Sequence, residues 1–544
     1  MAIKEIVKKG FSYIGGLNGI LFILYTVLIF SSYAFISKNT IIEDFSLSVS
    51  GFHTAMFIRS VGIITFLSLF ICPFILKKFN CISIPKTEET YHTIWFFYFF
   101  VAVFAVLFLH YIAYYPGGFS QDSFVQYKQA VSNQYGDWHP VFHTLFAIKL
   151  PLLITGGWIG SVVLFQIIVF SMVLAYAIYQ LLRFTGIRFA IGSLIFILLN
   201  PTTSNVLMFP WKDTSFMIGA ILLMTFAMQI FFTNGEWCSK KRNIVLLIIT
   251  ISFTTLFRHN AVLFTLPCLF AIAFSLKKKQ VAIISLTVLL IVLGIKYPLY
   301  NAMNVKKPNA RQVETLGLPM TVIGAIAKYD FDVLDEETKD FVLKVAPREI
   351  WDETYVYGSF NVVKFRRTET NCDVIEEYGT QKVLSMMMKC FKASPVHATL
   401  SLIRLTDGVY SLNDDYLYGV IPNVDANDVG IKEGGVSFLK TLNYYYTAIT
   451  TTIFPHLFTF VGTVHFVFIA MILAKFKFNR WNDLKTIFYI LPVFVYNFGS
   501  MLLLSHYGDV YRYFYYTFML VPILLAILLI NREERSSSSQ ALEK

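Results

Sequence analysis

Charged side chains are scarce in this sequence of 544 residues, because Asp, Glu, Lys and Arg together make up only 15% of it. Hydrophobic residues make up 56%, and they come in long unbroken runs rather than at the spacing of a half-buried helix or strand. Water-soluble domains do not have this composition. The shortage of charge therefore excludes a soluble protein and predicts a protein of the lipid bilayer.

Cysteine is rare as well, and none of the six cysteines lies at the spacing of a metal site. A structural zinc site needs a CxxC or Cys/His pattern, and the sequence has neither. The cysteines are therefore interpreted as packing residues. Cys372 and Cys390 alone lie in a polar segment, where a disulfide is the alternative if that segment meets an oxidising compartment.

The apolar runs predict about twelve transmembrane helices and an all-α polytopic fold. A spanning helix needs about 20 apolar residues, because its backbone must satisfy its own hydrogen bonds in lipid. Two pairs of runs are short and closely joined, and either pair could be a hairpin that does not fully cross. The expected spans are 17–37, 55–76, 92–113, 158–182, 190–209, 214–232, 243–257, 260–275, 280–298, 447–474, 484–504 and 511–530.

Clusters of basic residues fall on alternate loops between these runs, which is typical of the cytoplasmic side of a membrane protein. The net charge of +11 is thus a signal of topology, and without a basic stripe interleaved with aromatics it does not indicate a nucleic-acid partner. We expect a bacterial plasma-membrane protein with both termini in the cytoplasm. The clusters are Lys4/Lys8/Lys9, Lys77/Lys78, Arg183/Arg188, Lys240/Lys241/Arg242, Lys277/Lys278/Lys279, Lys475/Lys477/Arg480 and Arg532/Arg535.

This topology divides the chain into four parts. We expect a membrane domain at 1–298 with a large outer loop at 114–157, an extracytoplasmic helical and loop domain at 299–446, transmembrane helices at 447–535, and a disordered tail at 536–544. Within the outer domain, Asp332–Ala346 is predicted to be an amphipathic helix. The run 141–156 is too short to cross and is expected to lie at the membrane interface.

The outer loop carries the most informative stretch, from Tyr114 to His143. A Pro-Gly-Gly turn precedes Asp122, which lies at a predicted helix start, and His139 lies before Pro140. A carboxylate just above the membrane is suited to take a proton from a sugar hydroxyl as a general base. The alternative is that Asp122 only caps the helix or is solvated in a loop.

Further outer turns carry a cation beside a carboxylate or a histidine. Charge near a membrane boundary is costly unless it is paired or functional. Arg suits a phosphate group through its forked donors, and Lys suits it as a point charge. Interfacial snorkelling of long side chains is the alternative, and the aromatics nearby fit an interfacial belt. The residues are Lys212 and Asp213, then Arg258, His259 and Asn260, and finally His506, Asp509 and Arg512.

Four short motifs in these segments resemble those of GT-C fold glycosyltransferases, which are multi-span membrane enzymes. The resemblance covers 92–298 and 447–530, and it implies a polyprenyl-phosphate-linked sugar as donor outside the cytoplasm, with Asp122 as the catalytic carboxylate and 299–446 shaping the acceptor site. Many members of that family have two adjacent acids in the first loop, whereas Asp122 stands alone here. The motifs are Ser120–Gln126 (SQDSFVQ), Asp137–Pro140 (DWHP), Trp211–Asp213 (WKD) and Asp509–Tyr513 (DVYRY).

The expected reaction is an inverting sugar transfer to a cell-envelope acceptor such as a teichoic acid, a polysaccharide or a lipid. Asp122 would deprotonate the acceptor, while the cations stabilise the phosphate that leaves. No cofactor is expected, and no metal either, because a metal site calls for two or three converging carboxylates. Phosphate binding is assigned to Lys212, Arg258, Arg512 and His139, and substrate contact to Gln126, Asp213, His259, Asn260, Asp509 and Tyr513.

Two other classes of function stay open. A lipid-linked saccharide polymerase or ligase would also place Arg and His on the outer face. A polysaccharide or lipid transporter is the alternative without chemistry. Against a transporter, the ionisable residues gather at one predicted membrane face rather than at the midplane, and the sequence shows no inverted repeat.

Overall fold

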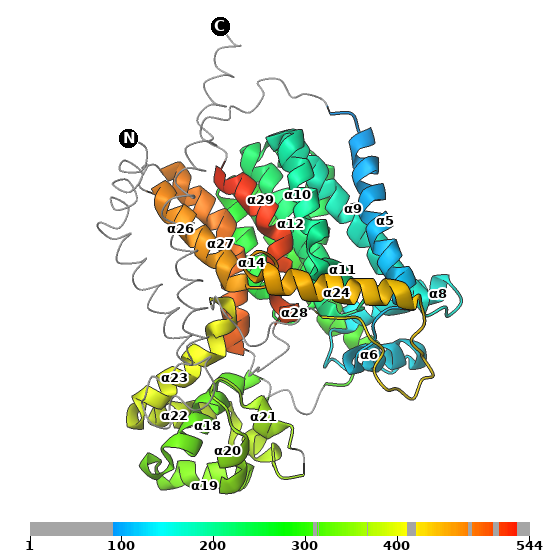
Figure 1. Ribbon diagram of the computed structural model, residues 1–544. Coiled ribbons are helices and arrows are strands. Elements are labelled where there is room, and N and C mark those ends of the chain that lie inside the picture. The colour runs from blue at the N-terminus through cyan, green and yellow to red at the C-terminus, as the bar shows by residue number, and fades with distance from the viewer. Residues whose placement is uncertain are drawn as a thin grey trace.

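A computed structural model describes residues 91–307, 313, 315–366, 368–410, 420–476, 481–503 and 511–529. This part of the chain is built of helices, and its only β-type pairings are isolated bridges (Figure 1). The all-α prediction is confirmed. The expected spans 17–37 and 55–76 lie outside the described residues.

Six helices among the described residues are long and apolar enough to cross a membrane, which identifies a membrane protein but does not confirm twelve spans. Expected and observed bounds agree within a few residues for most of these six. They are α5 (Ile94–Ala113), α9 (Gly160–Thr185), α12 (Lys212–Phe232), the run Lys278–Ala302 that contains α15 (Lys278–Gly294), η4 (Ile295–Leu299) and α16 (Tyr300–Ala302), the run Leu484–Leu503 of α27 (Trp481–Leu503), and the run Arg512–Leu529 of α28 (Tyr511–Phe514) and α29 (Tyr516–Leu529).

The expected span 190–209 is broken in its middle. Helix α10 (Ile187–Leu199) and helix α11 (Pro201–Leu207) meet at an angle of 65°. Pro201 has no N–H to donate and therefore opens α11, while the Asn200 side chain accepts a hydrogen bond from the amide of Thr202 at 3.1 Å. The next pair, α13 (Lys241–Phe257) and α14 (Val262–Ala273), falls below 18 residues in each helix.

The expected single span at 447–474 is wrong. The chain instead forms α24 (Ser437–Ile453), α25 (Pro455–Phe458) and α26 (Val461–Phe476). Phe454 leaves the helical region with φ −121° and ψ 45°, because the residue before a proline is disfavoured in the helical conformation. The apolar run continues through Pro455, so hydrophobicity alone could not show that the chain changes direction there.

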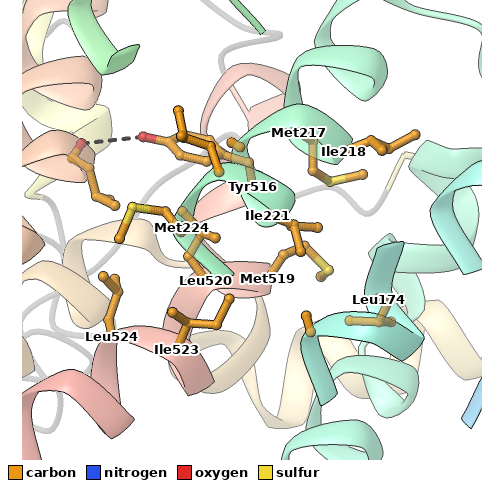
Figure 2. Close-up of a cluster of buried hydrophobic side chains, with 14 of the residues drawn as sticks. Leu174, Met217, Ile218, Ile221, Met224, Tyr516, Met519, Leu520, Ile523 and Leu524 are labelled. Carbon is orange, nitrogen blue, oxygen red and sulfur yellow. Dashed lines mark hydrogen bonds between the residues drawn. The ribbon is translucent and has the colours of Figure 1, made fainter. Parts of the chain in front are cut away.

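The main hydrophobic core lies around α12, which neighbouring helices cover on all sides. Figure 2 shows Met217, Ile221 and Met224 of α12 facing Tyr516 and Met519 of the last helix. A helix that is apolar all round must be buried by other helices or by lipid, and here helices do most of it. The hydroxyl of Tyr516 donates to the carbonyl of Val493 at 3.3 Å, which ties α29 to α27.

Residues 313–398 form a second hydrophobic cluster, located beyond one end of the bundle (Figure 1). Trp351 is fully buried there, and its indole N–H donates to the carbonyls of Val342 and Ala346 at 3.1 Å. Cys372 and Cys390 are both free thiols, so the alternative of a disulfide between them is wrong. The helices are α18 (Gly317–Tyr329), η5 (Phe331–Val333), α19 (Glu336–Val345), α20 (Arg348–Thr354), α21 (Asn361–Lys364), α22 (Asp373–Ala393) and α23 (Pro395–Thr406), with η6 (Asp407–Val409) following.

The predicted interfacial run 141–156 forms a short apolar helix rather than a span. It consists of α7 (Val141–His143), the π-helical turn η2 (Thr144–Lys149) and α8 (Leu150–Ile154). Helix α6 (Gln121–Ser132) precedes it and packs against η2. Together these elements form the loop between α5 and α9 that carries Asp122.

Candidate functional site

Two glycines allow the loop before α6 to pass close to the end of α11. The amide of Gly118 donates to the carbonyl of Met208 at 2.9 Å, and a Cβ atom at Gly118 would lie 2.6 Å from the ring of Phe209. Gly117 has φ +124°, a conformation that side chains other than glycine rarely adopt. The Pro-Gly-Gly turn therefore brings the start of α6 to the segment that contains Trp211 and Lys212.

A distant segment, 420–435, fixes the N-terminus of α6. The carboxylate of Asp425 accepts a hydrogen bond from the amide of Gln121 at 3.2 Å, and the amide of Asp425 donates to the carbonyl of Phe119 at 2.9 Å. Lys128 pairs with Asp428 at 2.6 Å further along the helix. A carboxylate at a helix N-terminus is favoured because the free amides there carry partial positive charge. The first turn of α6, which contains Asp122, is thus held from outside the loop.

Asp122 lies at the centre of a cluster drawn from four segments. Arg512 donates from Nη2 to Oδ2 of Asp122 at 3.3 Å. The ammonium of Lys212 lies 3.7 Å from the same oxygen, and Nε2 of His139 lies 3.8 Å from Oδ1. The Asp122 side chain is 32% exposed, against 14% for Arg512. The carboxylate is therefore the more open member of its pair with Arg512.

The cations keep this carboxylate ionised. Burial raises the pKa of Asp122, but the positive charges of Lys212 and Arg512 outweigh that effect and hold the pKa below its usual value. The pKa of His139 falls to about 3, first because burial disfavours the imidazolium and second because Lys212 repels it. Neutral His139 accepts a hydrogen bond on Nδ1 from Lys212 at 3.3 Å, which leaves the proton on Nε2, facing Asp122.

A second acid–base pair lies behind the first and is buried. Nη1 of Arg258 lies 2.6 Å from Oδ1 of Asp213, and both side chains are almost fully enclosed. The ring of Tyr513 lies 4.3 Å from the guanidinium carbon of Arg258 and 5.0 Å from that of Arg512. Arg512 also lies 5.1 Å from the ring of Trp211. Cation–π contacts of this kind hold guanidinium groups in place without neutralising them.

Three predicted site residues make other contacts. Gln126 is fully buried, where its side-chain carbonyl accepts from His143 at 2.6 Å, so it braces α6 against α7. His259 lies 3.7 Å from Asp137 and joins its turn to the loop before His139. Asn260 donates to the hydroxyl of Ser500 at 2.9 Å, which directs it toward α27. Asp509, together with His506, lies outside the described residues.

Sequence reasoning missed His143. It placed Trp211 in the WKD motif but left the role of its ring between an interfacial belt and stacking on a sugar. His143 is fully buried, and burial lowers its pKa to about 3. Trp211 donates from its indole N–H to the hydroxyl of Ser120 at 2.8 Å and stacks on Phe209. The polar neighbours Lys212 and Asp213 were the signal for Trp211.

The cluster carries an excess of positive charge. Lys212, Arg258 and Arg512 face the two carboxylates of Asp122 and Asp213, so the five groups sum to one positive charge when His139 is neutral. In the part of the chain that the structure describes, no three His, Cys, Asp or Glu side chains lie close enough to hold a metal ion. The chemistry that this arrangement offers is a carboxylate acceptor for a proton, next to cations for an anion.

The chain was compared with protein families, with curated proteins and with solved structures. No family model, no curated protein and no solved structure matches it. The proposed function therefore rests on the sequence motifs and on the geometry of the site.

Proposed function

We propose that this protein is a GT-C-type glycosyltransferase that moves a sugar from a polyprenyl-phosphate donor to a hydroxyl of a cell-envelope acceptor at the outer face of the bacterial plasma membrane. One observation carries the proposal. An open, ionised carboxylate, Asp122, lies within 4 Å of two cations, Lys212 and Arg512, at the end of a bundle of apolar helices. This combination suits a lipid-borne phosphate as leaving group and a hydroxyl as nucleophile.

The proposed reaction uses Asp122 as the base. Asp122 takes the proton of the acceptor hydroxyl, whose oxygen forms a bond to the anomeric carbon. The bond from that carbon to the phosphate oxygen breaks with inversion, and the phosphate leaves with the electron pair. Lys212 and Arg512 stabilise the negative charge that develops on the phosphate, while the buried pair of Arg258 and Asp213 supports them from behind.

The distances from Asp122 to its two cations support the roles of Asp122 as base and of Lys212 and Arg512 as phosphate ligands. Lys212 and Arg512 lie 3.7 Å and 3.3 Å from Asp122, whereas the buried pair of Asp213 and Arg258 closes to 2.6 Å. A phosphate that attracts Lys212 and Arg512 would withdraw positive charge from Asp122. The pKa of Asp122 would then rise, and its carboxylate would become a better base when donor is bound.

The proposed acceptor is a teichoic acid, another polysaccharide or a lipid. The helices between Gly317 and Thr406 lie beyond the same end of the bundle as α6 in Figure 1, so they are the part of the described chain suited to contact a large acceptor. No cofactor enters the proposed reaction, since a phosphate leaving group calls for cations rather than for an acid or a redox group.

Transfer of labelled sugar tests the proposal directly. Purified protein in detergent is given a panel of synthetic polyprenyl-phosphate sugars, with and without a chelator. We expect Asp122→Asn to slow donor consumption by about 10²- to 10⁴-fold, the range for loss of a general base. Glu236→Gln is the control, because Glu236 is an exposed acid in η3 (Glu236–Ser239), at the opposite end of α12 from Lys212.

The outcomes separate the alternatives. Chelator-independent consumption that Asp122→Asn abolishes and Glu236→Gln leaves intact supports the transferase. Consumption of a lipid-diphosphate saccharide chain instead indicates a polymerase or ligase. A folded wild-type protein that consumes no donor but moves a lipid-linked saccharide across a vesicle membrane indicates a transporter.

A further inference from the structure

Helix α24 (Ser437–Ile453) turns apolar side chains outward and polar side chains toward the bundle, which is the opposite of a surface helix on a soluble protein. The side chains of Phe438, Tyr445 and Ile453 point outward, with Phe438 73% exposed and Ile453 56% exposed. The residues that face the bundle are polar instead, and Asn443 and Thr447 are both buried. In water this arrangement would expose a contiguous apolar strip, which soluble monomers avoid.

A hydrogen-bond network fixes this orientation. Nδ2 of Asn443 donates to the hydroxyl of Tyr114 at 2.9 Å and to Oδ1 of Asn205 at 2.8 Å, and the ring of His110 bonds to Oδ1 of Asn443 at 3.1 Å. Asn205 in turn donates to Thr447 at 3.2 Å. Rotating α24 to place its apolar strip inward would leave these buried groups without partners, which is unfavourable because they could not bond to water instead.

The direction of α24 differs from that of the candidate spans. In Figure 1 it runs across the bundle, at a large angle to α5, α9 and α10, and near the end of the bundle where α6 and α28 lie. The outward residues Phe97, Val101 and Leu109 of α5 are also apolar and exposed, and α5 contacts α24. The apolar strip of α24 therefore continues a surface that an apolar spanning helix already presents to lipid.

We propose that α24 lies in the plane of the membrane, with its apolar strip inserted at the boundary between headgroups and acyl chains of one leaflet. The partner is thus a lipid surface. Helices with one apolar and one polar face bind at this boundary. The strip is Phe438, Leu442, Tyr445, Ile449 and Ile453, each of them exposed.

This placement sets the depth of the site in the membrane. Asn443 and Thr447 bind α11 through Asn205, and Tyr446 donates to the carbonyl of Leu199 at 2.6 Å, where the broken span bends. Helix α11 leads directly to Trp211 and Lys212. The Asp122 cluster is therefore held near the level of lipid phosphates, and this conclusion does not depend on which reaction the cluster performs.

Quenching of tryptophan fluorescence by brominated lipids tests the placement. The full chain is reconstituted in nanodiscs as Phe438→Trp and, separately, Ile453→Trp, which lie about 22 Å apart along the helix axis at 1.5 Å per residue. The bromines are placed either near the headgroup end or near the methyl end of the acyl chains. Met388→Trp is the control, because Met388 is 52% exposed like the residues of the strip but belongs to α22, which lies beyond one end of the bundle (Figure 1).

We expect the fluorescence that each α24 variant adds to that of the wild type to be quenched more strongly by the shallow bromines than by the deep ones, and to the same extent at both positions. The Met388→Trp signal should respond to aqueous iodide instead. Equal depth at both ends supports a helix in the membrane plane.

Three results would overturn the placement. A large difference in depth between the two positions would mean that α24 crosses the bilayer. Quenching by iodide alone would mean that the strip faces water. Protection from both quenchers, together with a doubled particle mass, would mean that a second copy of the chain covers the strip.

Discussion

The Asp122 cluster and helices α18–α23, which lie beyond one end of the bundle (Figure 1), both contain acid–base pairs, but the pairs differ in their surroundings. In α19, Lys344 lies 2.6 Å from Asp340 one turn away, and both side chains are about half exposed. Arg258 and Asp213 lie at the same distance, yet Asp213 lies in α12 and Arg258 follows the end of α13, and both are buried. Water and salt screen the first pair, whereas the second exists only because the helices place it. Two ion pairs with the same separation are therefore expected to contribute differently to the stability of the protein.

The largest expected effect comes from leaving one buried charge alone. Arg258→Met should destabilise the protein by about 3–5 kcal/mol, the cost of an unpaired buried charge. Thermal unfolding in detergent measures this. The double variant Arg258→Met with Asp213→Asn removes both charges and should recover most of the loss. If the single variant unfolds at the wild-type temperature, burial is not what distinguishes this pair.

The next effect concerns Arg512, which we assign to the leaving phosphate. Arg512→Met should reduce sugar transfer by about 10²- to 10³-fold, as expected when one group that stabilises developing charge is lost. Arg512→Lys should recover part of the rate, because Lys keeps the charge but not the fork or the stacking on Trp211 and Tyr513. Equal rates for the two variants would show that geometry matters more than charge.

Acid should weaken the Asp122 cluster before it affects the ion pairs of α18–α23. His139 and His143 have pKa values near 3 in the folded protein, but they regain a value near 6.5 on unfolding. The unfolded chain therefore binds more protons between these values, and stability falls as the pH drops through that window. At pH 5, a histidine with these two pKa values lowers the protein's free energy of unfolding by about 2 kcal/mol.

His143→Gln should flatten this pH dependence. Glutamine does not titrate, and it can replace the hydrogen bond from the His143 ring to Gln126. Unfolding temperatures measured from neutral pH to pH 5 give the comparison. A slope that is unchanged in the variant would assign the acid sensitivity to His139 or to groups elsewhere.

The smallest effect is expected in helices α18–α23. Lys344→Ala removes the exposed partner of Asp340 and should leave the unfolding temperature unchanged within error. Lys389→Ala tests the same expectation more strictly, because Lys389 pairs with two acids, Asp335 at 2.8 Å and Glu337 at 2.9 Å. A marked loss in either variant would mean that these surface pairs also determine structure.

Hydrophobic runs predicted α5, α9 and α12 closely, because a helix in lipid must be apolar along its whole length. They could not predict that 437–476 divides at Phe454, since lipid-facing in-plane and spanning helices are both apolar on the outside. They also could not show how α24 turns its polar residues inward, which depends on Asn205 and Tyr114 in other helices.

The positions of the charges were predictable, but their pairing was not. Lys212, Arg258 and Arg512 stood out because charge is rare beside apolar runs. That Arg258 pairs with Asp213, and Arg512 with Asp122, depends on how α12, α13 and the last helices pack. His143 escaped notice because it lies within an apolar run, where a neutral buried histidine leaves no mark on hydropathy.

The contact between Arg512 and Asp122 also has a consequence for the order of synthesis. The two residues are 390 positions apart, so a ribosome that has completed α6 must add most of the remaining chain before the guanidinium exists. Asp425, whose carboxylate accepts a hydrogen bond from the amide of Gln121 in α6, is synthesised earlier, 304 positions after Gln121. A nascent chain that ends between Asp425 and Arg512 would contain the residues that position α6 but would lack the guanidinium of Arg512. Such incomplete products of translation should therefore not transfer sugar.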